Sequence, residues 1–212
     1  MLAQRDSLWS NIESVNVAPA SPVLFPISNP DGNGDYLVHW SDVTGATSYR
    51  LEEDDNPAFT TPTARYTGES SEFQIYGQEP GTWYYRVRAS NAFGDSSWSN
   101  IEVVGVTPTA PVLLPISNPD GNGRYLVDWT GVTGATGYEL EEDDNAGFDS
   151  PVSRYEGTDT QFEVTGQQVG VWHYRVRAYN SAGYGSWSEP QIVTVWVPSY
   201  QVYLPVVMRG SP

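Results

Sequence analysis

Two acidic runs are the residues of this 212-residue chain best suited to chemistry, Glu52 to Asp55 and Glu141 to Asp144. Clustered carboxylates can bind calcium or act as a catalytic acid and base. Both activities need the carboxylates to converge on one point, whereas successive side chains of a β-strand point to opposite faces. The surrounding residues predict a strand, so we favour a structural role for both runs.

Strand parity places the charges of the first run opposite arginines. Two side chains, Tyr49 and Leu51, are expected to point inward. The outward residues of this strand are then Arg50, Glu52 and Asp54. The outward residues of its expected partner strand are Tyr84, Arg86 and Arg88. Cross-strand ion pairs follow, worth about 0.2–1 kcal/mol each at an exposed site.

The segment Asn29 to Asp35 resembles the first half of a helix–loop–helix calcium loop, with oxygen-bearing side chains at alternate positions and glycine at the sixth. The second half is absent, because Trp40 stands where a bidentate glutamate is needed. The repeated copy of the segment has Arg124 in place of Asp35. A glycine-rich turn is therefore the better interpretation.

The two histidines do not belong to a repeated site. The residues that correspond to His39 and His173 in the other half of the chain are Asp128 and Tyr84. Both histidines are predicted on outward faces. The chain also has no cysteine, no lysine and no nucleophile or phosphate motif. We expect no catalytic residue, no metal site and no cofactor.

Composition excludes two classes of partner. The formal net charge is −16, which opposes nucleic acid and anionic membranes. No run approaches the roughly 18 apolar residues of a membrane span. A chain that is 39% hydrophobic and 13% aromatic can nevertheless build packed cores.

An internal repeat organises the chain. Residues 26–34 return as residues 115–123, and residues 85–89 return as residues 174–178, an offset of 89 residues in both cases. Each copy has short stretches of alternating polar and apolar residues, rich in aromatic and β-branched side chains, between glycine and proline turns. The pattern predicts an all-β chain of two tandem antiparallel sandwiches, residues 18–106 and 107–197.

These residues resemble the fibronectin type III domain over about residues 18–197. The landmarks are a tryptophan on the second strand (Trp40, Trp129), a Tyr-x-Leu third strand and the stretch from Pro80 to Asn91. Tryptophan stands at Trp83 and Trp172, where spacing places the corner tyrosine of the family. An indole donates but cannot accept a hydrogen bond, so that corner is expected to differ.

The repeat is also similar to sandwiches found in arrays on secreted bacterial proteins. That resemblance implies an extracellular or cell-surface protein with a structural or adhesive role and no enzymatic activity.

A Trp-Ser pair recurs before each last strand and resembles half of the Trp-Ser-x-Trp-Ser box of cytokine-receptor sandwiches. There, a tryptophan stacks between arginines of the neighbouring strand. The corresponding sets here are Trp98 with Arg86 and Arg88, and Trp187 with Arg175 and Arg177. Each contact is worth about 0.5–1 kcal/mol, and we interpret these sets as scaffold.

Both ends of the chain carry strand-like segments outside the two sandwiches, residues 1–17 and 198–212. Residues 9–13 repeat the last-strand segment 98–102, and residues 202–207 match the first-strand segment 23–28. The predicted assembly residues are Trp9, Ile12, Val15, Val202, Tyr203, Leu204 and Val206. Either the chain is a slice of a longer array, or these ends join copies head to tail into a filament.

An alternative hypothesis from another class is an accessory or spacer module of a secreted polysaccharide-acting enzyme. Exposed Tyr84, Tyr179 and Tyr184 would then offer stacking surfaces. The partners expected overall are further copies of the chain, with carbohydrate or another surface protein as the alternative.

Overall fold

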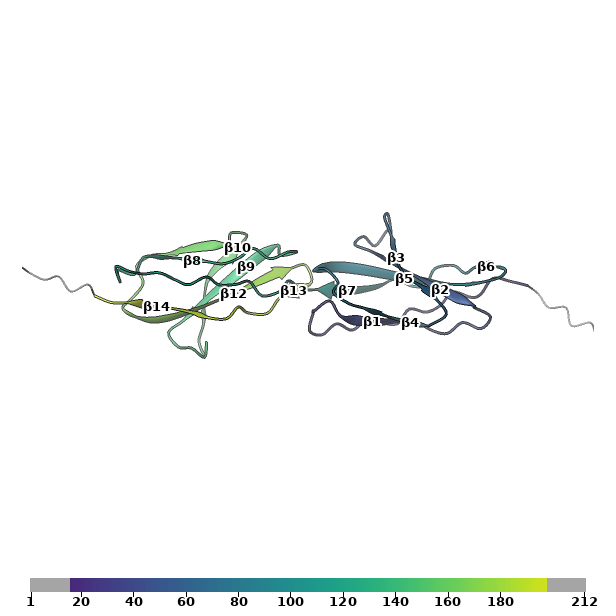
Figure 1. Cartoon of the computed structure of the whole chain (residues 1–212), viewed down its shortest axis with the longest axis horizontal. Coiled ribbons are helices and arrows are strands. Elements are labelled where there is room, and N and C mark those ends of the chain that lie inside the picture. The colour runs from purple at the N-terminus through teal and green to yellow at the C-terminus, as the bar shows by residue number, and fades with distance from the viewer. Residues whose placement is uncertain (1–15, 198–212) are drawn as a thin grey trace, which may run out of the picture. The chain divides into compact units, whose positions relative to one another are not determined.

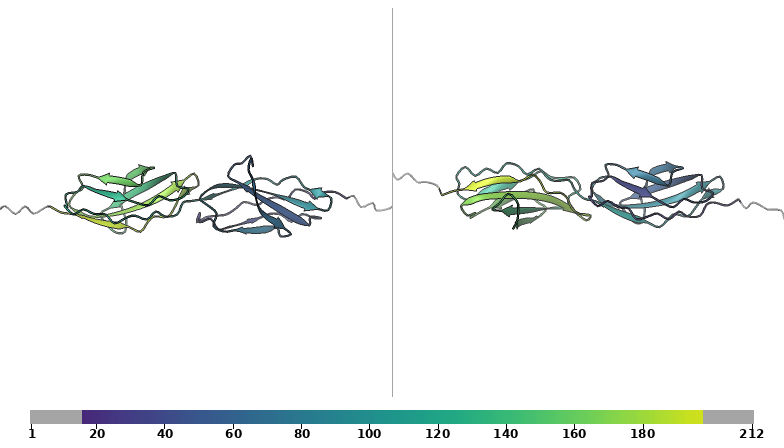
Figure 2. Two further views of the ribbon diagram at one scale, coloured as in Figure 1. Left: turned by 45° about the horizontal axis from the view of Figure 1, so that its top comes forward. Right: turned by 90° about the horizontal axis from the view of Figure 1, so that it is seen from below.

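A computed structural model describes residues 16–197, which form two compact units, each a β-sandwich (Figure 1). Every regular element within these residues is a strand. The predicted all-β fold with two sandwiches is confirmed. In each unit two sheets lie face to face, as the turned views show (Figure 2).

The first sandwich contains seven strands. They are β1 (Tyr36–His39), β2 (Ser48–Asp54), β3 (Thr63–Gly68), β4 (Glu72–Ile75), β5 (Gly81–Asn91), β6 (Gly94–Asp95) and β7 (Glu102–Val106). One sheet pairs β1 with β4. The other has the order β3-β2-β5, and both β6 and β7 pair with β5. The β1–β4, β2–β3, β2–β5 and β5–β6 pairings are antiparallel.

The second sandwich repeats this topology. Its strands are β8 (Tyr125–Asp128), β9 (Gly137–Asp143), β10 (Val152–Gly157), β11 (Gln161–Val164), β12 (Gly170–Asn180), β13 (Gly183–Tyr184) and β14 (Gln191–Val195). One sheet pairs β8 with β11. The other has the order β10-β9-β12, with β13 and β14 both on β12.

The outermost strands differ from the expectation. The predicted first strand, residues 23–28, forms only an isolated bridge between Leu24 and Trp40. Pro26 has no N–H to donate, which limits further pairing. Two backbone bonds flank this bridge, from the Phe25 N–H to the His39 carbonyl at 3.1 Å and from the Ser41 N–H to the Val23 carbonyl at 2.9 Å. The Asn100 side chain also holds the segment, accepting from the Leu24 N–H and donating to the Leu24 carbonyl, both at 2.9 Å. The last strand is split into β6 and β7.

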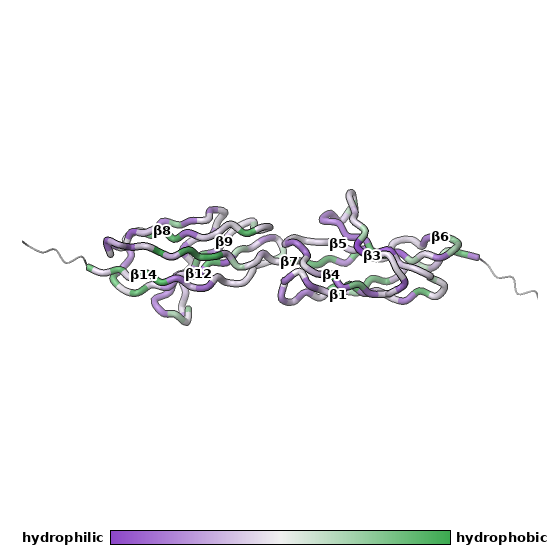
Figure 3. The backbone as a smooth tube through the Cα atoms, in the orientation of Figure 1, coloured by the Kyte–Doolittle hydropathy of each residue, from purple (hydrophilic) through white to green (hydrophobic). Residues whose placement is uncertain are grey.

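Alternation along the strands builds the cores. Trp40 and Trp129 are each 3% exposed, and the inward residues of β5 and β12 are fully buried. Short apolar and polar stretches alternate along the chain in both units (Figure 3). The burial predicted for the two tryptophans is confirmed, because period-two alternation puts one set of side chains inside.

The expected change at the family's tyrosine corner has a specific form in the second sandwich. The Trp172 indole Nε1 donates to the carbonyl oxygen of Gln168, four residues earlier, at 2.9 Å. The indole therefore anchors the start of β12 to the preceding turn by its one donor.

Candidate functional site

Arginines on the longest strand of the first sandwich stack against aromatic rings. The Arg86 guanidinium carbon lies 4.2 Å from the Trp98 ring centre and 4.2 Å from that of Phe59, while Arg88 lies 4.8 Å from Trp98. Arg86 and Arg88 are two residues apart on β5 and share its outward face. We call this stack, with its equivalent in the second sandwich, the arginine ladder.

The second sandwich extends the ladder by one ring. Arg175 lies 4.2 Å from Phe148 and 4.4 Å from Trp187. Arg177 lies 4.3 Å from Trp187 and 3.9 Å from Tyr184. The structure thus brings together the tryptophan and arginines of each sequence-predicted set, and adds rings that the sequence analysis did not include.

The phenylalanines of the ladder are the rings that sequence reasoning missed. Phe59 and Phe148 have φ angles of 51° and 52°, in the left-handed region that bulky residues rarely adopt. The Asp54 carboxylate organises the first of these loops, accepting from the N–H groups of Asn56 at 3.0 Å and Thr61 at 2.8 Å. The only sequence signal was that phenylalanine recurs after Leu-Glu-Glu-Asp-Asp-Asn in both repeats.

Hydrogen bonding keeps the Asp54 carboxylate charged. Burial acts to raise the pKa of Asp54, but the bonds from Thr61 and Asn56 outweigh it and leave the pKa below the usual value. The pKa of Asp143 is lowered in the same way. Asp54 and Asp143 are the third residues of the two acidic runs. Their carboxylates therefore bind the backbone of a loop and are not available to bind a ligand.

Glutamates lie beneath the ladder. Glu52 accepts from Arg86 Nη2 at 2.8 Å and from Arg50 Nε at 2.9 Å. Glu52 faces Arg86 across β2 and β5, which agrees with the outward direction predicted for both residues. The expectation of an exposed pair was wrong, because the Glu52 side chain is only 7% exposed under its covering arginines. The equivalent pair in the second sandwich is Glu141 with Arg175. Glu139, which stands where the first sandwich has Arg50, adds a pair with Arg177 that the first sandwich lacks.

A buried network lies on the other face of β2. The Tyr85 hydroxyl donates to the Glu53 carboxylate, and the Tyr36 and Tyr85 hydroxyl oxygens are 2.9 Å apart. Arg65 Nη1 reaches Glu53 at 3.3 Å, and the glutamate is 4% exposed. Burial raises the pKa of Tyr36 to about 12 and also raises that of Tyr85.

The same network stands in the second sandwich. Its members are Tyr125, Tyr174, Glu142 and Arg154. Sequence reasoning missed both networks, although the parity that sends Leu51 inward also sends Glu53 inward. A glutamate at an inward position, two residues after a buried leucine, was the available signal.

The candidate tyrosines and histidines do not form one site. Tyr84 is half-buried and faces Asp54 in the strand register. Tyr179 and Tyr184 meet edge to face in the second sandwich, with ring centres 5.4 Å apart. His39 is exposed, as expected. His173 shares the outward parity of Arg175 but is only 9% exposed, so its predicted exposure was wrong.

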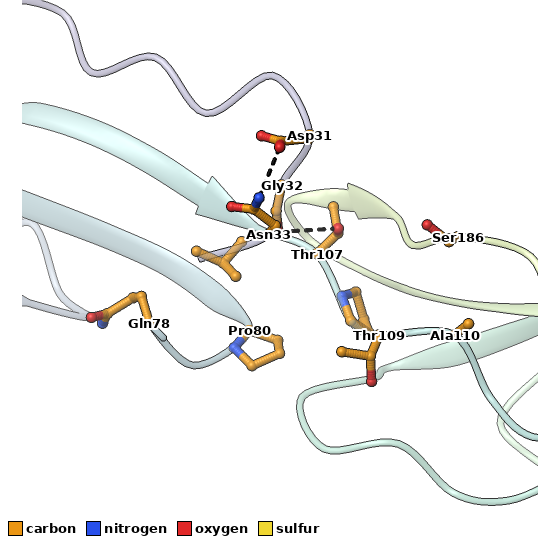
Figure 4. A pocket seen from close by; sticks show the side chains of 11 residues that line it. Asp31, Gly32, Asn33, Gln78, Pro80, Thr107, Thr109, Ala110 and Ser186 are labelled. Carbon is orange, nitrogen blue, oxygen red and sulfur yellow. Dashed lines mark hydrogen bonds between the residues drawn. The ribbon is translucent and has the colours of Figure 1, made fainter. Parts of the chain in front are cut away.

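The side-chain oxygens of the glycine-rich turn before β1 accept hydrogen bonds from other groups of the protein. Asn33 Nδ2 donates to the Asp31 carboxylate at 2.8 Å (Figure 4). Asn33 Oδ1 accepts from the Asp35 N–H at 2.9 Å. The Asp35 carboxylate accepts from the Gly77 N–H at 2.7 Å. Among residues 16–197, no group of three or more histidine, aspartate or glutamate residues is placed to hold a metal ion.

Two further observations concern the described part of the chain only. No helix there has the length and hydropathy needed to cross a membrane. The predicted assembly residues lie outside the described residues; they are Trp9, Ile12, Val15, Val202, Tyr203, Leu204 and Val206.

Comparison with known proteins shows the fold. A two-domain fibronectin type III segment of chicken tenascin superposes with a TM-score of 0.60 at 14% identity, covering 84% of this chain and 99% of that segment. The chain is therefore two tandem sandwiches of the fibronectin type III fold. No family model matches the sequence.

Two curated proteins are similar over parts of their length. Fibronectin type III domain-containing protein 7 of Homo sapiens is 28% identical over 170 residues, 79% of this chain. A Kelch domain-containing protein of Saccharolobus solfataricus is 36% identical over 95 residues, 43% of this chain. The matches span only 22% and 13% of those two proteins.

Proposed function

We propose that the chain is a non-catalytic structural and adhesive module that works outside the cell, at the cell surface. One observation carries this proposal: the acidic runs are engaged in the scaffold, in the same way in both sandwiches. Glu52 pairs with arginine, Glu53 joins a buried tyrosine network and Asp54 holds a loop. Carboxylates engaged in this way are not arranged to bind a metal or to transfer protons to a substrate.

The fold supports the same role. The tenascin segment consists of two fibronectin type III domains, as this chain does. We place the protein outside the cell because its repeat is similar to sandwiches found in arrays on secreted bacterial proteins.

The proposed mode of assembly is head to tail through the end segments. In the first sandwich, Asn100 of a Trp-Ser-Asn-Ile-Glu segment holds the backbone of Leu24 in a Val-x-x-Pro segment. The chain has the same two sequences at residues 9–13 and residues 202–205. By this equivalence, Asn11 of one copy would hold the backbone of Tyr203 of the next.

Electron microscopy and light scattering of the full chain test this mode of assembly. We expect fibres or concentration-dependent oligomers for the full chain and monomers after deletion of residues 199–212. Asn11→Ala should weaken the association, because it removes the acceptor and donor of the proposed clamp. Exposed Glu69→Gln serves as a control that should assemble normally.

A full chain that stays monomeric at high concentration would contradict the assembly mode. An enzyme activity lost on Glu52→Gln in a folded variant would contradict the non-catalytic role. Circular dichroism of each variant establishes that both sandwiches remain folded in these experiments.

A further inference from the structure

The second sandwich differs from the first at three positions that lie side by side. The first sandwich has Ser48, Ser90 and Asp95 at these positions. The second has Gly137, Tyr179 and Tyr184. Strand pairing brings the second set together, because Tyr179 on β12 is the partner of both Gly137 on β9 and Tyr184 on β13. The first sandwich therefore serves as an internal reference for this surface.

In the first sandwich, hydrogen bonds and an ion pair close the surface. The Ser90 hydroxyl donates to the Asp95 carboxylate at 2.6 Å, and Arg88 reaches the same carboxylate at 3.0 Å. The small polar side chains leave no aromatic surface at these three positions.

In the second sandwich, the same positions form an aromatic corner. The Tyr179 and Tyr184 rings meet at 63° with centres 5.4 Å apart. Tyr184 is 48% exposed, whereas Tyr179, which was expected to be exposed, is half-buried. A Cβ atom at Gly137 would lie 2.3 Å from the Tyr179 ring, so the glycine is what admits the ring. The three differences are thus physically coupled, since the Tyr179 ring occupies the space that a side chain at position 137 would need.

Polar groups border this corner. Arg177 lies over the Tyr184 ring at 3.9 Å and donates twice to Glu139 Oε2, at 2.8 and 2.6 Å. Both bonds use one oxygen, which leaves Glu139 Oε1 as an acceptor. Burial and the nearby Glu156 carboxylate raise the pKa of Tyr179, so its hydroxyl stays protonated and can donate.

We propose that Tyr179 and Tyr184 form a binding platform for a neutral polysaccharide. An exposed tyrosine offers an apolar face and a polar tip at low conformational cost, which suits the flat face of a pyranose ring and its hydroxyls. Glu139 accepts from sugar hydroxyls beside the ring. The platform extends beyond the proposed structural function and is independent of the end segments.

Charge selects the ligand class. The chain has a formal net charge of −16, and Glu139 and Glu156 stand beside the platform, so uronic acids and sulfated glycans would be repelled. A proline-rich peptide would present only carbonyl acceptors, which the tyrosine hydroxyls could bind but the two glutamates could not. The arginine at this corner already donates to Glu139, whereas the glutamate acceptors suit the many hydroxyl donors of a neutral sugar chain.

Affinity gel electrophoresis of the full chain tests this proposal, with hydroxyethylcellulose and glycogen as two neutral glucan probes. We expect at least one of them to retard the chain. The triple variant Gly137→Ser, Tyr179→Ser and Tyr184→Asp restores the residues that the first sandwich uses at the same positions. It should keep the fold and weaken binding about tenfold or more.

The reciprocal variant supplies a gain of function. Ser48→Gly, Arg50→Glu, Ser90→Tyr and Asp95→Tyr install the corner and its carboxylate in the first sandwich, since Arg50 stands where the second sandwich has Glu139. This variant should increase retardation by the same glucan. If the triple variant is destabilised in thermal unfolding, the single change Tyr184→Ser replaces it for the loss experiment.

Three results would overturn the proposal. The first is no retardation by either glucan, and the second is retardation unchanged in a folded variant that lacks Tyr184. The third is tighter binding of a polyproline peptide or an anionic glycan at this corner. None of these results depends on whether the chain assembles into filaments.

Discussion

Glu53 is a carboxylate placed among the inward side chains of β2, where a charge is stable only with full hydrogen bonding. Tyr85 and Arg65 supply that bonding, and Tyr36 extends it. Removing one hydrogen-bond partner of a buried acceptor lowers the stability of the protein most, because the acceptor is left unsatisfied. The network therefore specifies how the two sheets face each other as much as it stabilises them.

Replacing Glu53 should show this cost. We expect Glu53→Gln to lower the free energy of unfolding of the first sandwich by about 1–3 kcal/mol, because Arg65 loses its ion pair and Tyr85 loses a charged acceptor. Denaturant unfolding measures the change. Glu69→Gln, at an exposed position, should change stability by less than about 0.5 kcal/mol. Equal effects of the two variants would contradict the network's role.

The buried tyrosines predict sensitivity to alkali. Burial raises the pKa of Tyr36 and of Tyr125 to about 12, against about 10 in an unfolded chain. A raised folded-state pKa contributes stability that is fully present below pH 10 and is lost as the pH rises toward 12. Urea unfolding across this range should show the loss, and Tyr36→Phe should reduce the pH dependence. A stability that does not change between pH 9 and about 11.5 would contradict this.

At the scale of elements, the loop after β2 depends on the charge of Asp54. Its lowered pKa stabilises the fold above the unfolded value of about 4, and this stability is lost as the pH falls through the folded pKa. The stability difference between the native chain and Asp54→Asn should therefore be largest above pH 4 and shrink below it. Unfolding measured between about pH 2.5 and 6 tests the sign.

The first-strand segment depends on a side chain as well as on strand pairing. Asn100 bonds both the N–H and the carbonyl of Leu24, in addition to the two backbone bonds that flank the Leu24–Trp40 bridge. We expect Asn100→Ala to destabilise the first sandwich by about 1–3 kcal/mol. The equivalent residue of the second sandwich, Glu189, is exposed, and Glu189→Ala should be nearly neutral. Hydrogen exchange at the Leu24 amide would localise the effect.

At the scale of the whole molecule, each sandwich has its own core. The buried cluster around Leu140 and Val176 draws only on residues of the second sandwich. Leu51→Ala should lower the stability of the first sandwich by about 2–5 kcal/mol, and Leu140→Ala should do the same to the second alone. Hydrogen exchange resolved by peptide distinguishes the two. Loss of protection in both sandwiches from one substitution would show that their unfolding is coupled.

Much of the fold could be predicted because the sequence repeats and because polar and apolar residues alternate along its strands. The offset of 89 residues defined two units, and period-two patterns identified which face of each strand is buried, as at Trp40 and Val87. The pairing of Glu52 with Arg86 followed from the same parity. These features are local or periodic, so the amino-acid sequence alone is enough to predict them.

The tertiary structure decided which groups are covered and by what. Strand parity said that Glu52 points outward, but Arg86, which helps to bury it, comes from the neighbouring strand β5. Phe59 enters the ladder through a left-handed turn that Asp54 holds, and Tyr179 gains its place because Gly137, distant in sequence, lacks a side chain. Sequence patterns determine the direction of a side chain relative to its own strand. Burial and side-chain contacts depend on residues that are distant in sequence and become neighbours only on folding. The periodicity of the sequence does not identify these neighbours.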